Sequence, residues 1–313
     1  MALDGQKIVI GIDGGGTKTA GVLMTQSGQV LARYEVASTN PHSNPEPEVR
    51  SRMKSLIDTL IDQGAVNKNV LDGICLGMAG CDRPADKAFI EGIVREYVPD
   101  HTQIVIVNDA VVAMVAVLGR LHGVLVIGGT GSIVLGYHGD SGETVRCGGW
   151  GHFLGDEGSG YMIGLKGLQA IMQEFDGRGK ATSLTKRILG SLGLASPTDL
   201  IGWTYMSGKG KTEIAALARH VHEESDSGDA VAQDILQSQA EQLALQVCTV
   251  HRRLFPGATA PVPLALWGGN LINCKGFRDR FTAAVEESGL AFDIVLRDEQ
   301  AMVGAATHML NHL

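Results

Sequence analysis

The stretch Ile10–Met24, IGIDGGGTKTAGVLM, decides the fold of this chain. Three consecutive glycines lie between two apolar runs, with Asp13 before them and Thr17 after them. Apolar runs on both sides of a glycine turn predict a β-hairpin, with strands over residues 7–12 and 20–25. A tight hairpin turn needs only one or two glycines. A run of three therefore indicates a turn whose backbone amides approach a bound anion closely.

A second hairpin of the same kind lies in the other half of the chain. Residues 122–145 again read as an apolar strand, a glycine-rich turn at Gly128–Ser132, and a returning apolar strand. Two such hairpins, one opening each half, predict two related domains. We place these domains at residues 1–118 and 119–299, with the C-terminal helix in 300–313 packing back on the first.

In the first half, the strands at 7–12, 20–25 and 30–36 read as an antiparallel meander, and the alternating helices and strands that follow predict an α/β domain with a mostly parallel sheet covered on both faces. Further strands are expected at 71–78, 104–107, 263–267 and 292–296. Helices are expected at 53–61, 89–97, 110–118, 161–175, 230–254 and 300–310.

Composition excludes several classes of protein. The 313 residues carry a formal net charge of −8, and the scattered Lys and Arg form no nucleic-acid footprint. The longest apolar run, residues 110–118, is too short to cross a bilayer. The N-terminus lacks the apolar stretch of a secretory signal. The five cysteines contain no CxxC pair, which favours free thiols and a cytoplasmic location.

Both glycine turns are predicted to bind phosphate. The residues concerned are Gly14, Gly15, Gly16, Thr17 and Lys18 in the first turn, and Gly129, Thr130 and Gly131 in the second. The first turn is not a P-loop, because a threonine separates its last glycine from the lysine. Asp13 would repel a bare phosphate, so we expect Mg²⁺ between them, held by Asp13 through water. The alternative is a solvated turn aspartate.

Several motifs together resemble one family. GIDGGGTKT and IGGTGSI look like its two phosphate motifs, and WGGN at Trp267–Asn270 like its adenosine motif. STN at Ser38–Asn40 and GGWGHFLGDEGS at Gly148–Ser159 look like its sugar-binding segments. The family is the BadF/BadG/BcrA/BcrD-type ATPases, and within it the N-acetylglucosamine kinases of the sugar-kinase and actin-like superfamily. The resemblance covers nearly the whole chain. It implies two related actin-like (ribonuclease H-like) domains with a cleft between them, and phosphoryl transfer from ATP to the 6-hydroxyl of an amino sugar.

The resemblance also implies a role for individual residues. Asp109 would be the general base, Thr17 and Thr130 would hold phosphates, and Gly268 and Gly269 would lie against adenine. The sugar would be held by Asn40, Asp109, Gly149, Trp150, Gly151 and Asp156. Asp109 also follows an apolar strand, where α/β sheets place their ligands, and a positioned carboxylate can accept a hydroxyl proton.

Each of these residues has a simpler explanation. Asp109 could be the N-cap of the helix at 110–118. Asp156 and Glu157 look like first-turn helix acids, which leaves the role of Glu157 open. The Trp150 ring could stack on a sugar or pack in a core. Gly268 and Gly269 could simply end a strand.

The substrate and the activity have alternatives. N-acetylglucosamine is the expected sugar, but Pro41–Asn44 departs from the family's pattern, so glucosamine and N-acetylmuramic acid stay open. A redox-linked activator ATPase would need closely placed cysteines, and Cys75 and Cys81 alone are near each other. A non-catalytic sugar sensor is the third possibility. Residues 230–254 are a candidate homodimer surface, although core packing explains their apolar stripe equally well.

Overall fold

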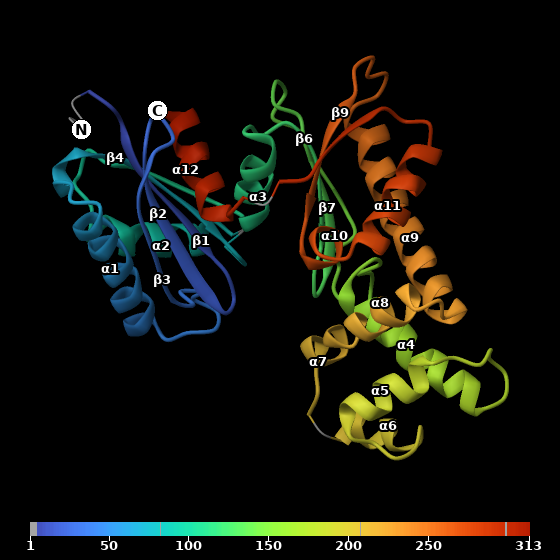
Figure 1. Cartoon of the computed structure of the whole chain (residues 1–313). Coiled ribbons are helices and arrows are strands. Elements are labelled where there is room, and N and C mark those ends of the chain that lie inside the picture. The colour runs from blue at the N-terminus through green and yellow to red at the C-terminus, as the bar shows by residue number, and fades with distance from the viewer. Residues whose placement is uncertain (1–4, 82, 207, 298) are drawn as a thin grey trace. The chain divides into compact units, whose positions relative to one another are not determined.

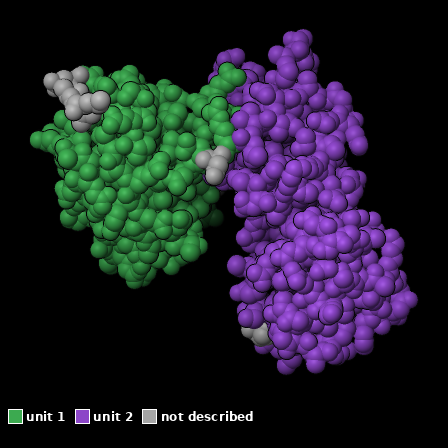
Figure 2. Space-filling view, viewed as in Figure 1, with its two compact units in different colours: residues 1–121, 297–313 green, residues 122–296 purple. Residues whose placement is uncertain are grey.

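The chain folds into two compact units, each built around one five-stranded sheet (Figures 1 and 2). The computed structural model describes residues 5–81, 83–206, 208–297 and 299–313. The first unit comprises Met1–Leu121 and Arg297–Leu313, and the second comprises His122–Leu296. No helix in these described ranges has both the length and the apolar character that crossing a membrane requires.

The sheet of the first unit combines a meander with two parallel strands. Its order is β3-β2-β1-β4-β5. The bounds are β1 Ile8–Gly14, β2 Lys18–Thr25, β3 Val30–Ala37, β4 Leu71–Met78 and β5 Gln103–Val107. β1, β2 and β3 pair antiparallel, whereas β1, β4 and β5 pair parallel. The predicted hairpin around the three glycines is therefore confirmed.

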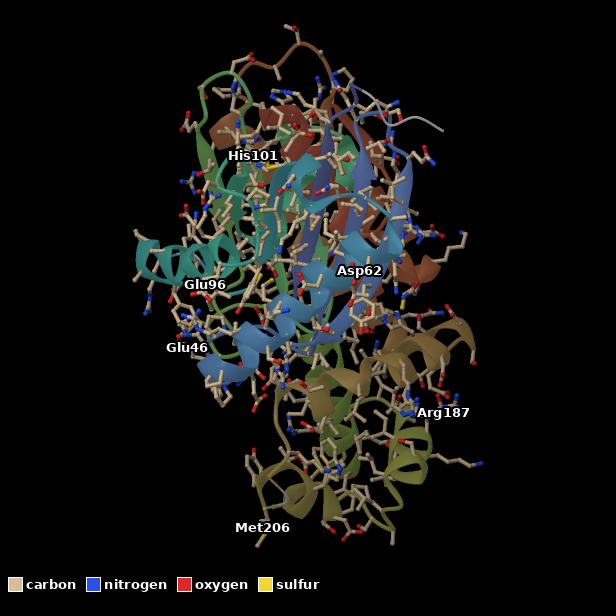
Figure 3. All side chains as sticks on the ribbon, turned by 90° about the vertical axis from the view of Figure 1, so that its left-hand side faces the viewer. Glu46, Asp62, Glu96, His101, Arg187 and Met206 are labelled. Atoms are coloured by element: carbon tan, nitrogen blue, oxygen red, sulfur yellow. The ribbon has the colours of Figure 1, made fainter. Side chains whose placement is uncertain are left out.

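Helices cover both faces of this sheet (Figure 1). They are α1 Glu46–Gln63 and α2 Pro84–Arg95 on one face, and α3 Asp109–Leu118 and α12 Ala301–His312 on the other, with a short 3₁₀ turn, η1, at Lys68–Val70. On the first face, Arg50 of α1 pairs with Glu46 on its own helix and with Glu96 just after α2. Figure 3 labels the two glutamates. The buried apolar side chains of α1 and α2 pack on those of β1 and β4 in a single core.

The C-terminal helix α12 packs on the first unit through glycines. A Cβ at Gly304 would lie 2.1 Å from the carbonyl oxygen of Val112 in α3, and one at Gly11 in β1 would lie 2.2 Å from that of Met302. Only residues without a side chain allow backbones to approach this closely. These two glycines therefore determine where α12 rests.

The second unit repeats the sheet of the first. The order β10-β9-β6-β7-β8 matches β3-β2-β1-β4-β5 when read from the other end. Its strands are β6 Gly123–Gly128, β7 Ser132–Tyr137, β8 Thr144–Cys147, β9 Val262–Trp267 and β10 Phe292–Val295. β6, β7 and β8 pair antiparallel, and β6, β9 and β10 pair parallel. The predicted repeat is confirmed, and so is the predicted antiparallel meander of β1, β2 and β3. The first sheet is not mostly parallel as predicted, because only two of its four strand pairs are parallel. Strands joined by short turns must run antiparallel, so both sheets are mixed.

The helices of the second unit form two groups. α9 Ala230–Leu254, α10 Gly269–Ile272 and α11 Lys275–Glu287 follow the chain toward β9 and β10. Between β8 and α9 lie α4 Gly160–Phe175, α5 Leu184–Leu192, α6 Asp199–Ile201, the π-helical turn η2 Gly202–Met206, α7 Lys211–Ala216 and α8 Ala218–Asp226. The predicted stripe of α9, from Leu236 to Leu254, is buried in the core of this unit. Core packing therefore accounts for the stripe, and a homodimer stays a prediction.

We predict that Gly304→Ala will destabilise the protein by more than about 2 kcal/mol, because its methyl group would overlap the backbone of α3. Gly92→Ala is the matched control, since that helix position is exposed and nothing lies within 4 Å of its Cβ direction. Alanine there should stabilise by up to about 1 kcal/mol. Thermal and urea unfolding of both variants measure the difference, and equal behaviour would contradict the close packing of α12.

Candidate active site

Strand register brings two carboxylates to one end of the first sheet. Asp13, near the end of β1, is paired with Gly77 of β4, and Gly77 is paired with Val107, the last residue of β5. Asp109 follows two residues later, at the start of α3. Parallel strands end at the same edge of a sheet, and ligands bind there in α/β folds.

The electrostatics of Asp13 reflect this placement. Burial and the negative charge of Asp109 raise the pKa of Asp13 to about 6, while Lys18 lowers it. The negative charge of Asp109 is therefore close enough to disfavour ionisation of Asp13. Among the described residues, no group of three or more His, Cys, Asp or Glu side chains could hold a metal ion. Mg²⁺ retains several waters and takes only one or two carboxylates, so Asp13 fits the predicted ion without a larger cluster of ligands.

Asp109 is the first residue of α3, and its neighbour Asn108 is the N-cap. The Asn108 side chain accepts a hydrogen bond of 2.9 Å from the amide of Ala110, and Asp109 Oδ1 accepts a second, of 3.0 Å. The alternative that Asp109 is the N-cap of α3 is therefore wrong, because Asn108 takes that position. A Cβ at Gly77 would lie 2.2 Å from Val112, so α3 rests directly on the end of β4 and holds Asp109 there.

The Ser38–Asn40 segment is hydrogen-bonded to the first glycine turn and to β2. Ser38 Oγ donates to the carbonyl of Gly15 at 2.9 Å, and the buried Thr39 amide donates to Thr19 Oγ1 at 3.0 Å. Asn40 donates through Nδ2 to the carbonyl of Ala79 and accepts through Oδ1 from the amide of His42. The predicted sugar residue Asn40 thus lies beside the predicted phosphate turn.

The two glycine turns present backbone amides in the same way. Gly15 N donates to the carbonyl of Lys18, and Gly129 N donates to that of Gly131, which closes each turn. Thr17 and Thr130 are both exposed. Within the described ranges, four amides donate to no backbone carbonyl: those of Gly16 and Thr17 in the first turn, and of Thr130 and Gly131 in the second. Such amides can bind the oxygens of a phosphate.

The second turn also caps α4. The carbonyls of Gly129 and Thr130 accept from the amides of Gly160 and Tyr161, the first residues of that helix. Ser159 is its N-cap. The interpretation of Asp156 and Glu157 as first-turn helix acids is wrong, since both precede the cap.

Asp156 and Glu157 have separate partners. Asp156 is only 2% exposed, and its Oδ2 lies 2.5 Å from Nζ of Lys211. Glu157 accepts a hydrogen bond of 3.0 Å from Gln246 of α9. Sequence analysis missed Lys211, because it lies 55 residues after Asp156 and belongs to no motif.

The Gly148–Gly155 loop is anchored at its ends and exposed in its middle. Trp150 N donates to the carbonyl of Gly155, and a Cβ at Gly149 would overlap Ile133. The Trp150 side chain is 61% exposed, so the alternative of core packing is excluded. The Arg146 guanidinium lies 4.3 Å from the centre of the Trp150 ring. Gly151 has open space where a side chain would be.

Gly268 and Gly269 follow β9, and their environments differ. Gly268 has φ +91°, and a Cβ there would lie 2.6 Å from the carbonyl oxygen of Gly128. Gly269 is exposed and has space around it. Gly268 is thus required by the fold, and contact of either residue with adenine stays a prediction.

The two cysteines that a redox-linked activator would use are inaccessible. Cys75 and Cys81 both have 0% exposure in the core of the first unit, and burial raises the pKa of the Cys75 thiol to about 12. A cluster shared between subunits needs exposed thiolates, so these side chains do not support that alternative.

Comparison with known proteins agrees with the arrangement of these motifs. The BadF/BadG/BcrA/BcrD ATPase family model matches residues 10–308. The chain is 39% identical, over 88% of its length and 89% of the relative's, to an N-acetylmuramic acid/N-acetylglucosamine kinase of Clostridium acetobutylicum. It is 35% identical, over 98% of both chains, to an N-acetyl-D-glucosamine kinase of Dictyostelium discoideum.

A solved structure shows the same fold. It is a candidate N-acetylglucosamine kinase of Porphyromonas gingivalis, with a TM-score of 0.74 and 22% identity over 98% of this chain and 100% of that one. The likeness confirms the predicted α/β class and the actin-like, sugar-kinase fold.

We predict that Gly268→Ala will destabilise the second unit by more than about 2 kcal/mol, because φ is positive and Gly128 leaves no room for a methyl group. Gly269→Ala is the control, with its nearest atom 3.8 Å from the added Cβ. Calorimetric unfolding should show a lower transition temperature for Gly268→Ala alone. If Gly269→Ala lowers the transition temperature as much as Gly268→Ala does, overlap with Gly128 is not the cause.

Proposed function

Because the chain belongs to the BadF/BadG/BcrA/BcrD ATPase family, we propose that it is an ATP-dependent kinase that phosphorylates the 6-hydroxyl of an amino sugar. The observation that carries the proposal is the convergence of Asp13, Asp109 and the Ser38–Asn40 segment around the first glycine turn. The two curated relatives named above, both kinases of N-acetylated amino sugars, support it.

Asp109 acts as the general base. Its carboxylate accepts the proton of the sugar hydroxyl, whose oxygen attacks the γ-phosphorus of ATP, and ADP leaves with the electrons of the broken bond. A positioned base contributes roughly 100- to 10,000-fold to such a step. Further acceleration comes from alignment and from neutralising phosphate charge.

The proposed nucleotide-binding groups are the two glycine turns and Asp13. In each unit the amides of the glycine turn and its threonine, Thr17 or Thr130, provide donors for phosphate oxygens. Asp13 would hold Mg²⁺ through water, and the ion would supply positive charge against the phosphates. Gly268 and Gly269 lie against adenine.

The charges on the sugar-binding segment favour an N-acetylated sugar over one with a free amine. The candidate sugar ligands are Asn40 in the first unit and, in the second, the Gly149–Gly151 backbone and Asp156. A free ammonium group would need an available carboxylate, but Asp156 is paired with Lys211 and Glu157 accepts from Gln246. Trp150, Phe153 and Leu154 on the same segment are exposed and apolar. We therefore propose N-acetylglucosamine as the substrate, with N-acetylmuramic acid as the second sugar to test.

A coupled ADP-release assay over N-acetylglucosamine, N-acetylmuramic acid, glucosamine and glucose tests the activity, and NMR of the product locates the phosphate. We expect sugar-dependent turnover, with N-acetylglucosamine preferred. Asp109→Asn should lower kcat about 100-fold or more, because the amide cannot accept the proton. Asp100→Asn, at the opposite end of β5, is the exposed control and should retain full activity.

Two results would contradict the proposal. If the unchanged protein releases ADP with no sugar of the panel, a non-catalytic sensor becomes the better explanation. If Asp109→Asn is as active as Asp100→Asn, Asp109 is not the base.

Activity should fall as the pH drops through about 6. The raised pKa of Asp13 means that its carboxyl is protonated below that pH and loses the charge that attracts Mg²⁺. Asp13→Asn should lower kcat/KM for ATP and move the acid limb of the pH profile to lower pH, since the titrating group is gone. Asp62→Asn, on the surface of α1 (Figure 3), is the control. An acid limb that stays in place in Asp13→Asn would assign it to another group.

A further inference from the structure

Lys211 is held against the second glycine turn. Its Nζ would lie 2.7 Å from a Cβ built on Gly131, whereas Oδ2 of Asp156 would lie 3.2 Å away. The ammonium is thus nearer to the turn than the carboxylate that holds it. No motif includes Lys211, which is the first residue of α7.

The Lys211 ammonium has more N–H donors than its bond to Asp156 uses. Lysine has three N–H donors, and Asp156 Oδ2 takes one of them at 2.5 Å. Within the described ranges, no other hydrogen bond or ion pair of Nζ is found. The Lys211 side chain is 33% exposed, so solvent or a ligand can reach it, whereas Asp156 is almost completely buried.

This pair has the charge arrangement that an anion site beside the turn requires. The buried carboxylate alone would repel a phosphate bound by the amides of Thr130 and Gly131. Lys211 neutralises that charge and presents its own donors on the same side. Because Asp156 restricts the ammonium to one position, little side-chain entropy remains to be lost when a phosphate binds.

The lysine of the first turn is placed differently. Lys18 pairs with Glu35 at 2.6 Å, and both side chains are more than half exposed. Water and salt screen such a surface pair strongly. The partly buried Lys211 is screened less, so its interaction with a bound anion is stronger.

We propose that Lys211 binds the polyphosphate of the nucleotide beside the Gly129–Ser132 turn, and that Asp156 positions it there. The proposal rests on the proposed function for the identity of the nucleotide. It adds a phosphate ligand that lies outside every motif recognised in the sequence. In this proposal Asp156 positions the Lys211 ammonium.

Nucleotide binding without sugar tests this role directly. We expect Lys211→Met to weaken binding of ATP and ADP by about 10- to 100-fold, the range for losing a charge-assisted hydrogen bond. Binding of adenosine should not change, because it carries no phosphate. Lys211→Arg should retain most of the affinity. Calorimetry measures the two nucleotides, and ligand-observed NMR measures adenosine. Lys209→Met removes the same charge from an exposed position two residues away and should bind like the unchanged protein.

A double variant separates phosphate binding from a structural role. Lys211→Met leaves Asp156 buried without a counter-ion, which can destabilise the unit by itself. Asp156→Asn combined with Lys211→Met removes both charges. If Lys211 binds phosphate, the double variant regains thermal stability but binds ATP more weakly than Asp156→Asn alone. Equal ATP affinity in Asp156→Asn and the double variant would overturn the proposal, as would equal weakening of adenosine and ATP in Lys211→Met.

The sugar-dependent assay on the unchanged protein keeps the two proposals apart. If it phosphorylates a sugar and Lys211→Met keeps full ATP affinity, only the role of Lys211 fails. If it phosphorylates none of the sugars while ATP affinity depends on Lys211, the kinase proposal fails and the phosphate ligand stands.

Discussion

The register of three parallel strands is the constraint on which the candidate site of the first unit depends. Gly77 of β4 is paired with Asp13 on one side and with Val107 on the other. The absence of a side chain at Gly77 lets α3 rest on the end of β4, so that Asp109 begins its helix beside Asp13. A shift of register by one residue would turn Asp13 to the opposite face of the sheet. The carboxylate pair therefore follows from strand pairing rather than from a flexible loop.

The two units share one sheet topology but place different charged side chains near their glycine turns. Each has a glycine turn between two antiparallel strands, and in each the turn leaves two amides available for an anion. In the first unit, Ser38 and Thr39 fasten the turn to a loop that carries Asn40. In the second, the turn caps α4, and Lys211 lies against it. The same backbone thus supports a carboxylate pair in one unit and a paired cation in the other.

The charged side chains near the two glycine turns have different partners. The pKa of Asp13 is raised first by burial and then by the nearby negative charge of Asp109. Asp156 is more deeply buried, but Lys211 compensates its charge within the chain. At the first turn two carboxylates lie near each other, whereas at the second a lysine neutralises the buried carboxylate.

The sequence by itself determined both hairpins, the strand that precedes Asp109 and the buried stripe of α9, because each depends on a pattern within a few neighbouring residues. It overestimated the parallel share of the first sheet, and it did not predict that Asn108 rather than Asp109 caps α3 or that Asp156 lies ahead of its helix. Lys211 could not be found from sequence either, since its contact with Asp156 joins residues 55 positions apart. Local periodicity carries no information about such a pair. Only tertiary packing determines that the buried Asp156 carboxylate pairs with Lys211.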